Sequence, residues 1–345
     1  MHPIEARADD FATARVLFQH ATLEDERRKV KYLNPFAEAP TVAEQVSGVL
    51  VIGRALSAIA NQSEQRINPH TVDGLLLWHD DPEERYGDLG RDQKRYAVLN
   101  EDRARQDIFG EVFWGQGVIH QIETFESGSD PHVKLARDAD ALYVIYTIKS
   151  LLDQGFAINK PEERIKNTLK RITTDAGIAL GQEMANHTPD DIWQSLSSYA
   201  GLDKEKFSPP PQSLGTIMAT GWALTELTNA SGKQISQDEI TDILLRQNEV
   251  PKDTFVGRLV EESRAIYDII HFKRELLKRL QDRSTGLSDE QIQSQIDQIL
   301  KERFNTDEGT VLGQVVAEMD PFEWWQIMMG YATVQPDGTA AMKPR

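Results

Sequence analysis

Apolar residues recur at the three- to four-residue spacing of an α-helix along almost the whole chain. Thr41 suits a helix N-cap, and a broad apolar stripe from Val49 to Ile59 follows it. Pro161 suits a first helical turn, and the apolar spacing continues from it to Leu180. The same spacing predicts further helices over residues 69–81, 97–117, 131–153, 213–229, 236–248, 252–283, 288–304 and 309–331. No segment alternates apolar and polar residues as a half-buried strand would, so we predict an all-α fold.

Signals of a new helix and of a linker follow His187 in the sequence. Residues 188–191, Thr-Pro-Asp-Asp, are typical of a helix start, and residues 208–211, Ser-Pro-Pro-Pro, are the clearest linker in the chain. We therefore predict one domain over residues 10–187, a helical C-terminal extension of unassigned role over 188–333, and a flexible tail over 334–345.

The charge balance limits the partners. In 345 residues the chain has 38 Lys and Arg against 55 Asp and Glu, a net charge of −17. Such a surface repels phosphate backbones, so we expect no duplex nucleic acid as a partner. The basic residues at 273–274 and 278–279 are expected to form the solvated side of a helix, because acidic residues flank them.

Cysteine is absent, which excludes a disulfide framework, a thiolate nucleophile and an iron–sulfur cluster, and which is compatible with a reducing cytosol. No stretch approaches the roughly 18–20 apolar residues of a membrane span. The first residues also lack the basic-then-apolar pattern of a secretory signal. We therefore expect a cytoplasmic protein that does not span a membrane.

The segment 77–89 is the sharpest candidate for chemistry. It holds the adjacent pair His79-Asp80 at the end of an apolar run, followed by Glu83 and by Asp88 within Gly-Asp-Leu. An imidazole and a carboxylate on adjacent residues can reach one cation when the backbone turns sharply between them. A bare His-Asp pair is a weak signal, so its interpretation depends on the residues that accompany it.

These accompanying residues resemble the HD superfamily of metal-dependent phosphohydrolases. The spacing His-Asp-x-x-Glu-x-x-x-Gly-Asp-Leu is similar to that of YfbR-like 5′-deoxynucleotidases. Residues 123–142 resemble the second metal motif of that family, with Asp140 in an Ala-Asp-x-Leu frame. Residues 41–47, Thr-Val-Ala-Glu-Gln-Val-Ser, stand where the family has Val-x-Glu-His-Ser. The resemblance covers roughly residues 10–185 and implies an HD-domain helical bundle, followed by an additional helical region that it does not cover.

The resemblance implies a role for each matching residue. His79, Asp80 and Asp140 match metal ligands of the family, Glu83 matches the carboxylate that positions or deprotonates water, and Asp88 matches a second catalytic acid. The implied cofactor is a divalent metal ion such as Mn²⁺, Co²⁺, Mg²⁺ or Zn²⁺. Such an ion acidifies bound water and neutralises charge on phosphoryl oxygens.

The first metal motif departs from the family pattern. Gln45 stands where the family has a histidine ligand, and a neutral amide is a poorer ligand for these transition metals than imidazole. We therefore expect weakened metal binding, with hydrolysis slowed, lost or redirected. Neither His20 nor His70 has a sequence signal that marks it as a replacement ligand.

Three arginines are candidates for binding the substrate phosphate, and their spacing does not separate them: Arg15, Arg27 and Arg28. The leading hypothesis is a phosphohydrolase acting on (deoxy)nucleoside 5′-monophosphates or a related phosphoester. The alternative is a non-catalytic HD protein that binds a nucleotide or a protein partner, with the C-terminal helices as its interaction module. A homodimer is also considered, because the aromatic and methionine residues at 324–329 suit either the core or a dimer contact.

Overall fold

The structure, a computed structural model, describes residues 7–28, 39–88, 97–202, 213–246, 253–280 and 287–320. Most of these residues lie in fifteen α-helices. These residues contain no β-strand, and extended pairing is confined to isolated bridges such as the antiparallel one between Arg27 and Thr41. The predicted all-α fold is therefore confirmed. The predicted tail at 334–345 lies outside the described residues.

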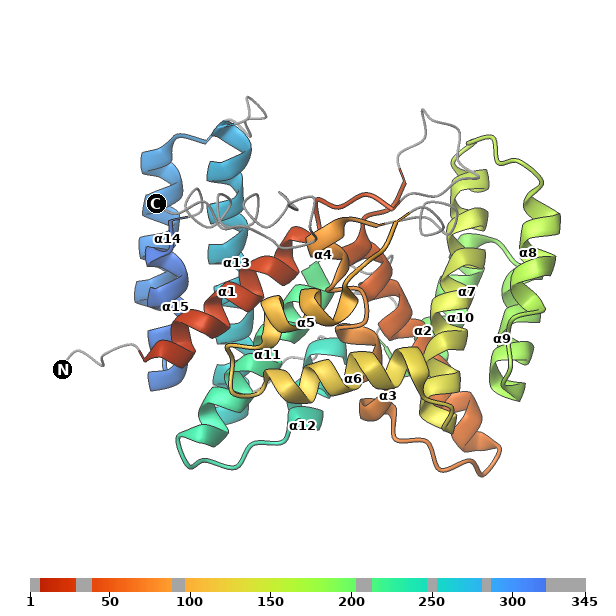
Figure 1. The fold of residues 1–345 in the computed structure, drawn as a ribbon, viewed down its shortest axis with the longest axis horizontal. Coiled ribbons are helices and arrows are strands. Elements are labelled where there is room, and N and C mark those ends of the chain that lie inside the picture. The colour runs from red at the N-terminus through yellow and green to blue at the C-terminus, as the bar shows by residue number, and fades with distance from the viewer. Residues whose placement is uncertain are drawn as a thin grey trace.

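Of the helices preceding residue 187, α2 and α7 pack against each other, and α3 and α9 pack on both of them (Figure 1). The helices preceding residue 187 are α1 (Ala8–Thr22), α2 (Val42–Gln62), α3 (Pro69–Leu77), α4 (Glu83–Tyr86), α5 (Glu101–Phe109), α6 (Gly115–Ser127), α7 (Pro131–Asp153), α8 (Pro161–Leu169) and α9 (Asp175–Asn186). Local capping explains where the two central helices begin. The Thr41 hydroxyl accepts from the Glu44 amide at the start of α2, and Asp130 caps α7 ahead of Pro131.

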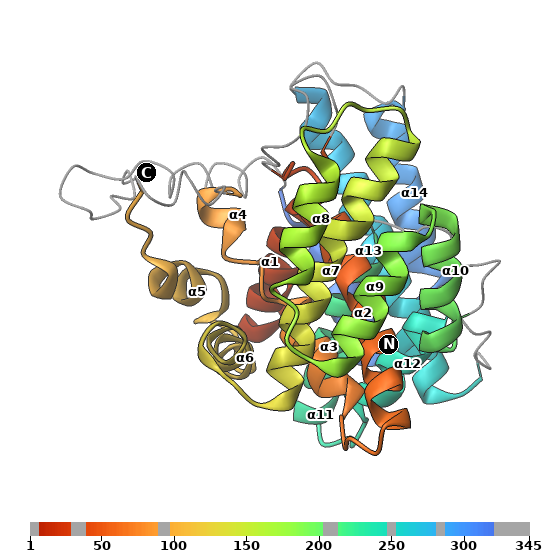
Figure 2. The ribbon, with the colours of Figure 1, turned by 90° about the vertical axis from the view of Figure 1, so that its right-hand side faces the viewer.

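Two predicted helices are each divided into two. The segment 97–117 contains α5 and the start of α6, with turns between Gly110 and Trp114. A side chain at Gly115 would place its Cβ only 1.8 Å from the carbonyl oxygen of Phe109, so this turn requires glycine. The segment beginning at Pro161 likewise divides into α8 and α9, because Thr174 caps a new helix. Figure 2 shows α4, α5 and α6 on one side of the main bundle.

The helices after residue 187 share the core of the preceding ones. They are α10 (Pro189–Ala200), α11 (Ser213–Ala230), α12 (Gln237–Arg246), α13 (Phe255–Leu280), α14 (Asp289–Glu302) and α15 (Asp307–Glu318). Helix α10 packs on α2, as α9 does, and α1 packs on α11 and α15. The predicted boundary at residue 187 therefore falls between two helices that contact the same central helix.

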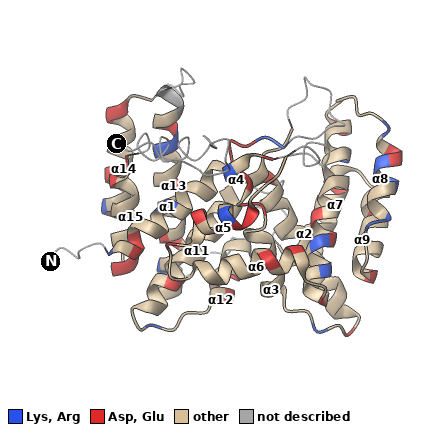
Figure 3. Ribbon diagram, in the orientation of Figure 1, with Lys and Arg blue, Asp and Glu red and all other residues tan. Residues whose placement is uncertain are grey.

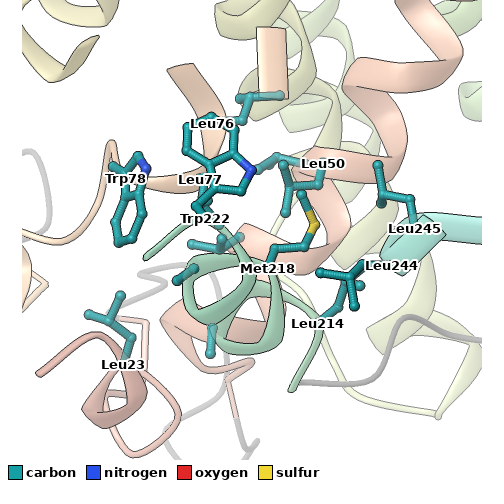
Figure 4. Packing of buried hydrophobic residues seen from close by; sticks show 14 of the residues in the cluster. Leu23, Leu50, Leu76, Leu77, Trp78, Leu214, Met218, Trp222, Leu244 and Leu245 are labelled. Carbon is teal, nitrogen blue, oxygen red and sulfur yellow. The ribbon is translucent and has the colours of Figure 1, made fainter. Parts of the chain in front are cut away.

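Trp78 links the two regions. Its ring centroid lies 6.4 Å from that of Trp222 in α11 and 5.2 Å from that of His20 in α1, and its side chain is fully buried (Figure 4). A further link is ionic: Arg274 of α13 pairs with Glu24 and Asp25 after α1. Because Arg274 is buried, the prediction that it lies on a solvated helix side is wrong. Local sequence patterns could not predict this ion pair, because the partners lie some 250 residues earlier in the chain.

The expectation that no stretch approaches a membrane span is wrong for α2, which is long and apolar enough by length and composition. However, 78% of its most apolar window is buried inside the molecule. Burial on all sides is also the ordinary condition of a core helix.

Lys and Arg positions are distributed over several helices rather than gathered on one (Figure 3).

Candidate functional site

Two consecutive turns after α3 present the predicted His-Asp motif. Helix α3 ends at Leu77, and the Asp81 amide then donates to the Trp78 carbonyl at 3.2 Å. The Glu83 amide donates to the Asp80 carbonyl at 2.9 Å, and the short helix α4 begins there. This turn brings the backbone of Glu83 beside that of Asp80.

His79 is held in one orientation by its backbone and by an aromatic ring. Its Nδ1 lies 2.8 Å from the Leu76 carbonyl oxygen, which can only accept, so Nδ1 carries a proton. Its Nε2 is buried, has no hydrogen-bond partner and lies 3.2 Å from Oδ2 of Asp80. The ring packs on Phe125, from the predicted second motif, with centroids 4.7 Å apart. Burial alone would lower the pKa of His79, but the carboxylates of Asp80 and Asp140 raise it to about 9.

Asp140 of α7 lies close enough to His79 to raise the pKa of its ring, and Gln45 of α2 contacts Asp140. Gln45 Nε2 donates to Oδ1 of Asp140 at 2.6 Å, and Gln45 Oε1 is buried without a hydrogen-bond partner. Asp138, two residues earlier, points to the opposite side of α7 and accepts from the amides of Thr173 and Thr174. The structure therefore gives these two carboxylates separate surroundings.

Arg28 lies among the carboxylates of the motif. Its guanidinium is 3.6 Å from Oδ2 of Asp80 and 3.4 Å from Oδ2 of Asp88. Burial would lower its pKa, but Asp80, Asp140, Asp88 and Glu83 together raise it above its ordinary value. We call these four carboxylates, with Arg28, His79 and Gln45, the acidic cluster.

Backbone pairing explains why Arg28 rather than another arginine occupies the acidic cluster. The Arg28 amide donates to the Pro40 carbonyl at 3.0 Å, beside the bridge that joins Arg27 to Thr41. Arg27 points elsewhere and donates to the Ala39 carbonyl, and Arg15 pairs with Glu111 at 2.5 Å. Of the three arginines left open by the sequence, the structure brings only Arg28 to the predicted ligands.

Sequence reasoning missed a buried pair directly behind the motif. Nδ1 of His20 in α1 lies 2.9 Å from Oδ1 and 3.0 Å from Oδ2 of Asp81, and both residues are almost fully buried. Burial raises the pKa of Asp81, and the His20 ring opposes that rise. His20 is thus committed to fixing the turn after His79. His70 lies in another cluster, where its Nδ1 is 3.0 Å from the Arg54 guanidinium. Neither histidine is part of the acidic cluster.

The donor chemistry of the acidic cluster fits a divalent transition metal. Nε2 of His79 and Oε1 of Gln45 are buried without a hydrogen-bond partner, and both are electron-pair donors when His79 is neutral. Asp80 and Asp140 add carboxylate oxygens. The Nδ1 contact to a backbone carbonyl is the outer contact that metal-binding histidines ordinarily make. In the described residues, however, no three His, Cys, Asp or Glu side chains are already arranged to hold a metal ion. Arg28 and a protonated His79, whose pKa is raised to about 9, now supply the positive charge among these carboxylates.

No protein-family model, curated protein or solved structure matches this chain.

Proposed function

We propose that this protein is a metal-dependent phosphohydrolase that acts on (deoxy)nucleoside 5′-monophosphates or a related phosphoester. The observation that carries the proposal is the acidic cluster itself. Residues 28, 45, 79–88 and 140 come from four separate parts of the chain, and they supply donors for a divalent cation beside a guanidinium. Perturbed ionisable groups with a shared environment are typical of functional sites.

Each residue has a role in this proposal. His79, Asp80 and Asp140 would hold the metal, with Gln45 as a weak fourth ligand that also orients Asp140 through its amide hydrogen bond. A bound divalent ion would supply Lewis-acid chemistry, lowering the pKa of water and neutralising phosphoryl charge. Glu83 would accept the proton of the attacking water, and Asp88 would donate one toward the leaving oxygen. Arg28 would bind the phosphate oxygens, for which a guanidinium fork is well suited.

The test is phosphate release from a panel of nucleoside monophosphates with Mn²⁺, Co²⁺ and Mg²⁺. Release should depend on the metal and be lost in Asp80→Ala. It should persist in Asp297→Ala, which removes an exposed carboxylate on α14. Absence of metal-dependent release from every substrate would contradict the proposal.

The second candidate is a non-catalytic HD-type protein that binds a nucleotide or a protein partner. It is favoured by a specific observation: Arg28 already supplies a positive charge among the carboxylates, and the Gln45 amide donates a hydrogen bond to Asp140 where the family has a ligand histidine. In that case helices α11 to α15 would serve as the interaction module. Nucleotide binding that needs no metal and leads to no phosphate release would support this candidate.

A further inference from the structure

A cavity of about 350 Å³ lies between the first turn of α3, the middle of α6 and the start of α12, and we call it the α6 cavity. This volume lies within the range of small-molecule sites, roughly 300–1,000 Å³. It adjoins the first turn of α3, whereas His79 follows the last, and the nine residues of this helix span about 13 Å. None of the described residues that line it belongs to the acidic cluster. The α6 cavity is therefore a separate candidate site.

Two carboxylates line the α6 cavity. Asp130 caps α7, and Asp238 lies in the first turn of α12 with its side chain 54% exposed. Burial opposes ionisation of Asp130, but the amides of His132 and Val133 donate to it and hold the pKa of Asp130 below its ordinary value. Among the described residues that line the cavity there is no lysine or arginine. The fixed charge of its walls is therefore negative unless the neighbouring histidines are protonated.

The surroundings of His70, which lines the α6 cavity, keep its ring neutral. Its Nδ1 lies 3.0 Å from the Arg54 guanidinium, which can only donate, so Nδ1 accepts and carries no proton. Burial and the positive charge of Arg54 also lower the pKa of His70. Arg54 pairs with Asp73 at 2.5 Å and with Asp242 at 2.8 Å, so its charge is already matched by two carboxylates.

His132, beside Asp130, is neutral for the same reason. Its Nε2 accepts from the Asn68 amide at 3.1 Å, which leaves Nδ1, 3.2 Å from Oδ1 of Asp130, as the protonated nitrogen. Neither His70 nor His132 therefore cancels the charge of the two carboxylates. The electrostatic field of the α6 cavity favours a cationic ligand.

The remaining walls of the α6 cavity offer a hydrogen-bond acceptor and an apolar surface. Gln121 Oε1 is buried and has no hydrogen-bond partner. A Cβ at position 74 of α3 would lie 3.1 Å from Nε2 of Gln121 and 3.0 Å from Cη2 of Trp222, so Gly74 allows both side chains to lie close against α3. The Trp222 indole N–H already donates to the Thr241 hydroxyl at 2.8 Å, so its ring contributes apolar surface rather than a donor.

We infer that the α6 cavity binds a small aliphatic amine in its ammonium form. The ammonium group carries a positive charge and three donors, which match the carboxylates of Asp130 and Asp238 and the amide oxygen of Gln121. The alkyl chain lies against Trp222. The same walls would repel phosphate and carboxylate ligands, and a neutral polyol would gain nothing from their charge. Because no residue of the acidic cluster takes part, amine binding does not depend on the hydrolase proposal.

The test is calorimetric titration of the full-length protein with putrescine and with 1,4-butanediol, which has the same chain length and hydroxyl groups in place of the amines. Both titrations are run at pH 8 and physiological ionic strength, because a net charge of −17 attracts cations nonspecifically at low salt. Putrescine should bind at one site and at least about tenfold more tightly than butanediol, the effect of one hydrogen bond between charged groups.

Variants of Asp238 locate the site. Asp238→Asn should weaken putrescine binding about 3- to 20-fold, because the carboxylate is half exposed and its charge is partly screened. Asp238→Lys places a competing ammonium group at the cavity and should abolish the binding. Asp297→Asn and Asp297→Lys make the same changes of net charge at an exposed carboxylate of α14 and should leave putrescine affinity unchanged.

Equal affinity for putrescine and butanediol, or no binding of either, would overturn the inference. Unchanged putrescine affinity in Asp238→Lys, with the variant folded by circular dichroism, would also overturn it, because the amine would then bind elsewhere. None of these titrations measures phosphate release. A protein that binds putrescine at this site and releases no phosphate from any substrate would therefore support the α6 cavity assignment and refute only the hydrolase.

Discussion

Replacement of Arg28 by methionine should raise the affinity for a divalent metal and lower the affinity for phosphate. The guanidinium is the positive charge already placed among Asp80, Glu83, Asp88 and Asp140, so an incoming cation must compete with it for the same carboxylates. Methionine retains an unbranched side chain of similar length and removes the charge. The two effects have opposite signs, and a nonspecific loss of structure would not produce both.

The contacts of Arg28 set the size of the effect. Its guanidinium lies 3.6 Å from Asp80 and 3.4 Å from Asp88, and its side chain is 26% exposed. A unit charge pair at such a distance is worth about 4–5 kcal/mol at an effective dielectric constant of about 20, before desolvation and screening reduce it. Hydrogen bonds to charged groups have net values of about 1.5–3 kcal/mol. Since about 1.4 kcal/mol is tenfold in an equilibrium constant, we expect metal affinity to rise about 10- to 100-fold.

The assay is calorimetric titration with Mn²⁺ at pH 8, followed by phosphate binding to the metal-loaded protein. Arg28→Lys keeps the charge and should bind metal much as the wild type does. Arg27→Met removes the neighbouring guanidinium, which points to the Ala39 carbonyl, and should also leave metal affinity near the wild-type value. Unchanged Mn²⁺ affinity in Arg28→Met would mean that the carboxylates around Arg28 do not hold the metal.

Three further outcomes are expected. Gln45→His should raise both the affinity for Mn²⁺ and Co²⁺ and the rate of phosphate release, because it supplies an imidazole ligand. Metal titration of a double variant that also carries Asp80→Ala should show no gain in affinity. An undiminished gain in the double variant would mean that Gln45 does not face the metal. Glu83→Gln should lower turnover by about 10²–10⁴-fold at near wild-type metal content, measured by steady-state kinetics and metal analysis, whereas full activity would remove Glu83 from the reaction. In the metal-free protein, the raised pKa of His79, about 9, stabilises the fold below about pH 6.5, and this contribution of at most about 3 kcal/mol is lost as pH rises through 9. Urea unfolding between pH 6 and 10 should show that loss, and His79→Asn should lack it; equal pH profiles for the two proteins would contradict the raised pKa.

The helices could be predicted where local signals decide their ends. Helix α7 occupies residues 131–153, as predicted, because Asp130 caps it and Pro131 fits its first turn. The same reasoning failed over residues 97–117, where charged residues continued the helical pattern through Gly110. The break there depends on the close approach of Gly115 to the Phe109 carbonyl, a contact that apolar periodicity does not encode.

The candidate site could also be predicted from the sequence only in part. His79, Asp80, Glu83 and Asp88 could be proposed because one short segment carries them all. Arg28 could be named only as one of three candidates, because its place depends on the pairing of residues 26–28 with 40–42. The contact of His20 with Asp81 spans 61 residues and has no sequence signal, since a lone histidine in an apolar helix face resembles any core residue. Tyr143 and Tyr146 of α7 line a cavity beside the start of α2, and the sequence did not distinguish them from core aromatics.

The charge balance of the acidic cluster connects its two proposed ligands. The acidic cluster holds four carboxyl groups, against which Arg28 and a protonated His79 supply two positive charges. A phosphate dianion entering that environment would meet an excess of negative charge with one guanidinium to bind it, and a half-buried site would weaken that repulsion less than water does. A divalent cation would turn this electrostatic repulsion of the phosphate into attraction, because it supplies two positive charges beside Arg28 at the place where the anion must lie. The metal and the phosphate should therefore bind cooperatively, each raising the affinity for the other by the same factor. Their order of addition should leave the final complex unchanged.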